Sequence, residues 1–213
     1  MEWFLDMCII LFYSEDERTS SLKVKKLMEF VKNKGQKRFV VCFYIIENDL
    51  PKYIVRQRIV IRELQRKINN PDYIIGSIGE GLKLCPRDKN LAEQFYHLMK
   101  TTQKPQEFIM KLNEIRTKVE NRINFFIQTI VNEKVILLNE IDFELRSSLF
   151  TYTKNISDSN ILASGIQQHN KKELFLLTED KKDWNKDNLN WAMTAQLLKK
   201  YPKVPEVKYV KDL

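Results

Sequence analysis

Four acidic residues each stand beside a strongly apolar segment of this chain, although long stretches of sequence separate them. They are Asp6, Glu47, Asp158 and Asp180. A carboxylate at the end of a buried element is costly to hold unless a positive charge balances it. A divalent cation bound by oxygen ligands supplies such a charge, and these ions commonly serve phosphate chemistry. The four residues therefore predict a metal site.

Two of these acids follow predicted strands. Asp6 closes the short apolar run Trp3-Phe4-Leu5, and Asp180 comes shortly after the apolar run 174–177. The carboxyl ends of parallel strands meet at one edge of a sheet, where α/β proteins bind their ligands. We therefore expect both side chains to lie at that edge.

The other two acids stand at the predicted starts of helices. Glu47 ends an apolar region whose first part, 38–42, is a predicted strand, and it is expected to begin a long helix bent near Pro51. Asp158 opens a helix whose apolar positions recur at +3, +4, +7 and +8, so it heads the stripe that faces the sheet. Both helix starts are expected at the same rim as the strand ends.

Each acid also has a purely structural alternative. Asp6 could end a strand in a turn, and Asp158 could cap its helix. Glu47 could pair with a lysine, and Asp180 could shape the loop before Trp184. Taken one at a time, each acid fits its structural alternative at least as well as a metal site.

A helical stretch interrupts the alternation of strands and helices. The segment Asn69-Asn70-Pro71-Asp72 breaks the pattern, and two helices are then predicted at 91–100 and 106–131. We expect a helical insertion at about 70–132.

Regular α/β alternation is predicted to return after the insertion. A helix is expected at 143–152, another at 189–198, and a last edge strand at 207–210. The fold class is therefore α/β, with an open, mainly parallel sheet flanked by helices. The whole chain, 1–213, is expected to form a single domain that carries the insertion.

Composition limits the classes of function. Lys and Arg outnumber Asp and Glu by 36 to 28, which gives a formal charge of +8 and suits a polyanionic partner such as nucleic acid. The three cysteines form no CxxC motif and only two histidines occur, which argues against zinc and against a histidine-dependent nucleophile. The beginning of the chain does not resemble a secretory signal, and the longest apolar run, 39–46, is too short to span a bilayer. We expect a cytoplasmic protein with no membrane partner.

Four stretches carry a family resemblance. They are Phe4-Leu5-Asp6-Met7-Cys8-Ile9-Ile10, Ile45-Ile46-Glu47, Asp158-Ser159-Asn160-Ile161-Leu162-Ala163 and Leu176-Leu177-Thr178-Glu179-Asp180-Lys181-Lys182-Asp183-Trp184. The last two are the most specific, because an Asp opens an Ile-Leu-Ala helix and a strand then ends in Thr-x-Asp-x-x-Asp-aromatic. Over residues 1–69 and 133–213, the chain resembles the PIN domain family of metal-dependent ribonucleases, especially the VapC-type toxins of toxin–antitoxin pairs.

The resemblance implies an endoribonuclease that uses Mg²⁺ or Mn²⁺ to hydrolyse RNA phosphodiester bonds. The catalytic residues that it implies are Asp6, Glu47, Asp158 and Asp180, and the implied metal ligands are Asp6, Asp158, Asp180 and Asp183. Thr178 would orient a carboxylate or the attacking water. RNA is the implied substrate, and an antitoxin protein and a second copy of the chain are the implied protein partners.

Two departures from the family pattern leave alternatives open. Met7 and Cys8 stand where the family commonly has a small polar residue and then Asn, and the insertion makes the chain longer than a compact toxin. One alternative is a catalytically weak or inactive PIN-like module that binds RNA or protein. The other is an RNA-processing or DNA-directed nuclease.

Overall fold

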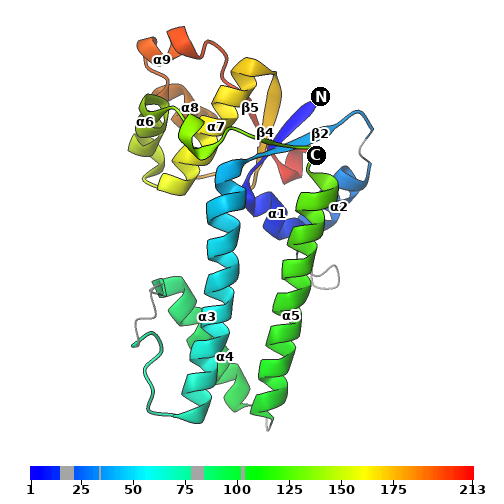
Figure 1. Ribbon diagram of the computed structural model, residues 1–213, viewed down its shortest axis with the longest axis vertical. Helices are drawn as coiled ribbons and strands as arrows, with labels where there is room; N and C mark the ends of the chain where they lie inside the picture. Colours follow the sequence, from blue (N-terminus) through cyan, green and yellow to red (C-terminus); the bar gives the residue numbers. More distant parts are fainter. Residues whose placement is uncertain (15–21, 34, 78–83, 102–103) are drawn as a thin grey trace. The chain divides into compact units, whose positions relative to one another are not determined.

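The computed structural model describes residues 1–14, 22–33, 35–77, 84–101 and 104–213. The chain divides into two compact units (Figure 1). The α/β unit consists of Met1–Leu50 and Arg122–Leu213, and the helical unit consists of Pro51–Asn121.

An all-parallel sheet forms the centre of the α/β unit. Its strands are β1 (Glu2–Leu5), β2 (Arg38–Cys42), β3 (Glu133–Val135), β4 (Leu174–Thr178) and β5 (Glu206–Tyr209). They lie side by side in the order β3-β2-β1-β4-β5. The prediction of an α/β fold with a parallel sheet is therefore confirmed, and the architecture is compatible with a PIN-like fold.

The strand order of this sheet includes a switch point. The central strand β1 pairs with both β2 and β4, so that Trp3 lies between Phe39 and Phe175. From β1 the chain steps outward to β2 and β3, and it then crosses back to β4 and β5. The order reverses between β1 and β4, and the crevice beyond the carboxyl ends at such a switch point is where open α/β sheets bind ligands.

Helices cover both faces of the sheet. They are α1 (Met7–Ser14), α2 (Leu22–Lys32), α6 (Phe143–Thr153), α7 (Ile156–Lys171), α8 (Lys186–Ala192) and α9 (Ala195–Lys200). Helices α6 to α9 gather on one side of the sheet, and α1 and α2 lie on the other (Figure 1). No helix in the described ranges is both long and apolar enough to cross a membrane.

Helix α7 lies very close to the strands that it covers. A Cβ atom at Gly165 would stand 2.7 Å from Leu176 Cδ2 and 3.4 Å from the Phe4 ring. The absence of a side chain at this position lets the helix approach β1 and β4. The approach fixes the first turn of α7 relative to the carboxyl ends of these strands.

Several element boundaries differ from those predicted. The strand β3 was not predicted, because it has only three residues, of which Glu133 and Lys134 are exposed. The helix predicted at 189–198 is broken, because α8 ends at Ala192 and Thr194 caps the next helix by accepting a hydrogen bond from Leu197 N at 3.3 Å. The structure also places a π-helical turn, Ile45–Asp49, where the bend near Pro51 was predicted.

The helical unit is built from α3 (Leu50–Asn69), α4 (Pro86–Lys100) and α5 (Pro105–Phe125). Its core includes Leu64 and Ile61 from α3 together with Tyr96 and Met99 from α4. It spans 51–121 and therefore starts and ends earlier than the insertion expected at about 70–132. The last residues of α5 and the π-helical turn that follows belong to the α/β unit.

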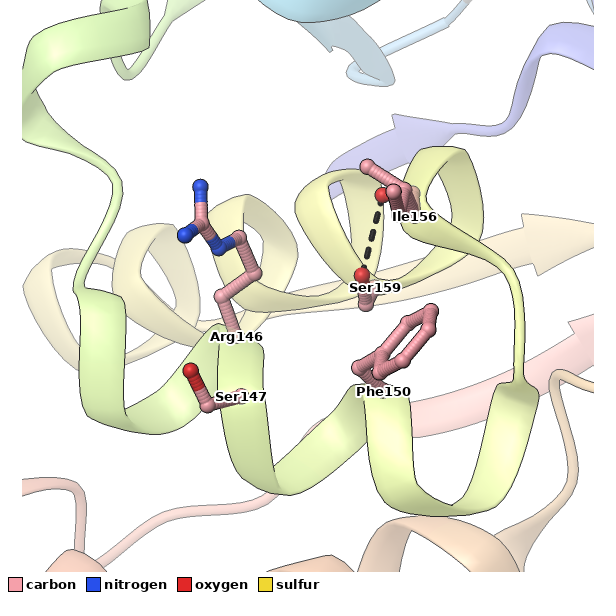
Figure 2. Close-up of a pocket in the computed structure, with 5 residues that line it drawn as sticks. All are labelled: Arg146, Ser147, Phe150, Ile156 and Ser159. Carbon is pink, nitrogen blue, oxygen red and sulfur yellow. Dashed lines mark hydrogen bonds between the residues drawn. The ribbon is translucent and has the colours of Figure 1, made fainter.

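A pocket of about 290 Å³ lies between α6 and the first turn of α7 (Figure 2). Its lining residues are Arg146, Ser147 and Phe150 from α6 and Ile156 and Ser159 from α7. Asp158 therefore belongs to the same helical turn that forms one wall of this pocket.

Candidate metal centre

Three carboxylates converge beyond the carboxyl ends of β1 and β4. One oxygen from each of Asp158, Asp180 and Asp183 lies within 4.8 Å of the others. Asp158 comes from the first turn of α7, whereas Asp180 and Asp183 come from the loop that follows β4. The structure thus brings together three of the residues predicted as metal ligands.

Asp6 lies beside this group, directly after β1. Its backbone N–H donates to Leu177 O at 3.0 Å, so the pairing of β1 with β4 continues to the acid itself. The Thr178 hydroxyl donates to Asp6 Oδ2 at 2.6 Å, and the Cys8 thiol donates to the same oxygen at 2.9 Å. Only 4% of Asp6 is exposed, and both of these side-chain donors are uncharged.

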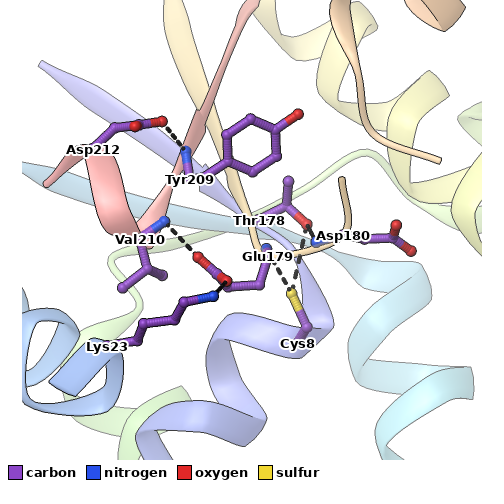
Figure 3. A network of polar contacts seen from close by, with 8 residues as sticks. All are labelled: Cys8, Lys23, Thr178, Glu179, Asp180, Tyr209, Val210 and Asp212. Carbon is purple, nitrogen blue, oxygen red and sulfur yellow. Dashed lines mark hydrogen bonds and ion pairs between the residues drawn. The ribbon is translucent and has the colours of Figure 1, made fainter. Parts of the chain in front are cut away.

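Asp180 is oriented by the backbone of its own loop. Its Oδ1 atom accepts hydrogen bonds from the N–H groups of Lys182 and Asp183, at 2.9 and 3.0 Å. The Asp180 N–H donates to the Thr178 hydroxyl at 2.9 Å (Figure 3). Thr178 therefore contacts the carboxylate of Asp6 and the backbone of Asp180 at once, which suits the orienting role predicted for it.

The neighbouring acid Glu179 serves a different purpose. Its carboxylate forms an ion pair with Lys23 at 2.6 Å and accepts a hydrogen bond from Val210 N at 2.9 Å (Figure 3). Its own N–H donates to Cys8 Sγ at 3.2 Å. Glu179 thus joins β4 to α2 and to the residues after β5, and its charge is already balanced.

Asp158 is not the cap of its helix. Asn155 caps α7 by accepting a hydrogen bond from Ser157 N at 2.9 Å. Asn155 also donates to Asp158 Oδ2, and Trp184 Nε1 donates to Asp158 Oδ1 at 3.2 Å. Trp184 is fully buried, which makes it a core residue that also orients this carboxylate. The capping alternative raised for Asp158 is thus not realised.

The π-helical turn Ile45–Asp49 contains two acids, Glu47 and Asp49, and it is Asp49 that contacts the first turn of α7. It accepts a hydrogen bond from the Ser157 hydroxyl. Glu47 lies on the exposed surface of the same π-helical turn and is outside the group of three carboxylates. Its predicted catalytic role remains a prediction. Sequence reasoning missed Asp49, because a π-helical turn changes which side chains share a face.

Burial and mutual repulsion change the proton affinity of these acids. Burial, followed by the charge of Asp6, raises the pKa of Asp158 to about 7. Burial is also the main cause that raises the pKa of Asp6 and of Asp183, and the charge of Asp180 contributes to both shifts. Within the described ranges, no Lys or Arg forms an ion pair with any of the four acids.

The residues present fit a hard divalent cation. All the candidate donors are carboxylate oxygens, which Mg²⁺ and Mn²⁺ prefer over nitrogen or sulfur. The donors that orient Asp6, Asp158 and Asp180 are neutral, and Lys182 offsets only part of the rise in the pKa of Asp183. A bound cation would supply the missing positive charge and lower the raised pKa values.

Cys8, which stands where the family pattern commonly has Asn, is part of this network. Burial, together with the charge of Asp6, raises the pKa of Cys8 well above the usual value, so the thiol stays protonated and donates a hydrogen bond to the Asp6 carboxylate. No local sequence signal indicates this contact, because it depends on how α1 leaves β1.

Comparisons of the chain with family models, with curated proteins and with solved structures found no match. The resemblance to the PIN domain family remains a prediction from the sequence.

Proposed function

We propose that this protein is a nuclease with a PIN-like fold that uses Mg²⁺ or Mn²⁺ to hydrolyse RNA phosphodiester bonds within the strand. One observation carries the proposal. Asp158, Asp180 and Asp183 converge at the switch point of a parallel sheet, Asp6 lies beside them, and the side chains and N–H groups that orient these acids are uncharged. The negative charge of these carboxylates is therefore available to bind a cation.

Each residue of the site has a defined task in this proposal. Asp6, Asp158, Asp180 and Asp183 would hold the cation. Thr178 and Cys8 fix the Asp6 carboxylate through its Oδ2 atom. When bound, a divalent cation stabilises the negative charge that develops on the scissile phosphate and favours attack by water.

The charge distribution suits RNA as the substrate. The chain carries a formal charge of +8, although the candidate centre itself is acidic. Lys181 and Lys182 are exposed and directly follow Asp180. Cations around an acidic centre attract a polyanionic strand, while the centre itself admits phosphate only together with a cation.

Cleavage of a defined panel tests this function. Full-length protein is incubated with Mn²⁺ and with structured RNA, single-stranded RNA or single-stranded DNA. Asp180→Asn and Asp158→Asn should each lower the rate of RNA cleavage by about 100-fold or more, because each removes a charge that the cation requires. Asp187→Asn, at an exposed acid of α8, is the matched control and should cleave normally.

The outcomes separate the proposal from its alternatives. Equal cleavage by wild type and by both site variants would contradict the assigned residues. Preference for single-stranded DNA would indicate a DNA-directed nuclease. Salt-sensitive RNA binding without cut products would indicate the non-catalytic binding module, for which the thiol contact between Cys8 and Asp6 is the favouring observation.

A further inference from the structure

The pocket between α6 and α7 combines a cation, an aromatic ring and hydroxyl groups (Figure 2). Arg146 and Phe150 extend from α6 on the side that faces the first turn of α7. Phe150 is 41% exposed and Ile156 is 62% exposed, so the apolar walls of the pocket are open to a ligand.

Arg146 has charge available for a ligand. Its guanidinium lies 5.0 Å from the ring centre of Phe143, and it forms no ion pair with any acid in the described part of the chain. Several other arginines are paired, as Arg58 is with Glu120. A half-buried arginine without a carboxylate partner is well suited to bind a phosphate.

A short chain of residues connects the pocket to the candidate metal centre. The pocket residues Ile156 and Ser159 stand on either side of Asp158 in the first turn of α7. Asp49 accepts a hydrogen bond from Ser157, the residue before Asp158. The pocket therefore shares the first turn of α7 with Asp158, one of the three carboxylates of the candidate centre.

We infer that this pocket binds one nucleotide of a single-stranded RNA next to the scissile phosphate, with the base against Phe150 and a backbone phosphate on Arg146. The inference rests on the proposed function, because it names a subsite of the same nuclease. An aromatic face accepts any base, since every base can stack. The hydroxyl groups of Ser147 and Ser159 also line the pocket, but they do not select one base over another.

RNA binding tests the inference without depending on catalysis. All proteins carry Asp180→Asn to suppress cleavage, and the probe is a fluorescein-labelled oligouridylate of about 12 nucleotides. Phe150→Ala should weaken binding about tenfold, which is typical of the loss of one stacked base. Phe150→Leu should do the same while keeping apolar volume, which excludes a simple packing defect.

Salt dependence distinguishes the two contacts. Arg146→Ala should weaken binding and reduce the slope of log K against log salt by about 0.7, as expected for one lost phosphate contact to a single strand. The Phe150 variants should leave this slope unchanged. Phe125→Ala and Arg87→Ala remove an exposed ring and an exposed cation elsewhere and should change neither quantity.

The results separate this inference from the function on which it rests. If the wild type cleaves RNA but the Arg146 and Phe150 variants bind like the controls, the subsite is wrong and the nuclease proposal stands. That result would indicate that the exposed apolar residues Phe150 and Ile156 bind a protein partner and not a base. If the wild type neither cleaves nor binds RNA, both proposals fall.

Discussion

The two units of the chain treat their buried carboxylates differently. In the helical unit, Glu63 and Asp88 are 2% and 6% exposed. Arg66 pairs with Glu63 at 2.7 Å, and Arg56 pairs with Asp88 at 2.6 Å. Both of these buried carboxylates are therefore paired with an arginine of the same unit.

In the α/β unit, Asp6 and Asp183 are as deeply buried, at 4% and 8% exposed, but neither forms an ion pair within the described ranges. The same unit does balance Glu2, whose carboxylate pairs with Lys172 at 2.9 Å. Burial alone therefore does not explain the uncompensated charge. The difference is the one expected if the acids at the switch point bind the proposed cation, whereas the paired acids stabilise the fold.

Removing the arginine from a balanced pair should have the largest effect on stability. Arg66→Met leaves the buried Glu63 charge without its cation and should lower the free energy of unfolding by about 3 kcal/mol. Urea denaturation measures this loss. Adding Glu63→Gln to Arg66→Met should restore most of the stability, because the buried charge is then removed. If Arg66→Met alone lowers the free energy of unfolding by less than about 1 kcal/mol, the arginine is not needed to balance Glu63 and the two units do not differ in this respect.

The uncompensated acids should make stability depend on pH in the absence of a cation. The pKa of Asp158 is about 7 in the folded protein, above the value of about 3.9 for an unfolded Asp. The folded state therefore holds a proton that the unfolded state releases, so this stabilisation is lost as the pH rises through 7. We expect the melting temperature in EDTA to fall by several degrees between pH 5.5 and pH 8.

Asp158→Asn is the control for this pH effect. It removes the titrating group, so its melting curve should vary less with pH and should lie above that of the wild type at pH 8. A wild-type melting temperature that rises over this interval would show that the buried acids are not held protonated in the folded state.

A smaller effect is expected from the hydroxyl that orients Asp6. Thr178→Val keeps the shape of this buried residue but removes the donor to Asp6 Oδ2, and it should weaken Mn²⁺ binding by about tenfold. Thr178→Ser keeps the hydroxyl and should retain most of the affinity. Equal affinities for the two variants would show that this hydrogen bond does not prepare the site.

Sequence patterns predicted the parts of the fold that follow from local physics. The apolar runs identified β1, β2 and β4, and the placement of Asp6 and Asp180 after two of these strands predicted their common edge. The spacing after Asp158 predicted which face of α7 meets the sheet, and Gly165 shows how closely it does so. Each of these features depends on residues that are neighbours in the chain.

The features that were missed depend on local backbone geometry or on contacts between distant segments. The short strand β3 forms only by pairing with β2, where Val135 lies opposite Cys42. Asp49 approaches Ser157 because of the π-helical turn, and Cys8 reaches Asp6 because α1 begins directly after it. No periodicity in the sequence encodes such contacts, so they required the structure.

The most direct test is a calorimetric titration of the wild-type protein with Mn²⁺ at pH 6.5, in two buffers with different ionisation enthalpies. The acids must lose their protons to bind a cation, so we expect saturable binding with release of about one proton, given the raised pKa of Asp158. Asp180→Asn should bind far more weakly, whereas Glu63→Gln in the helical unit should bind normally. No saturable binding by the wild type, or equal binding by Asp180→Asn, would contradict the claim that these four carboxylates form a cation site.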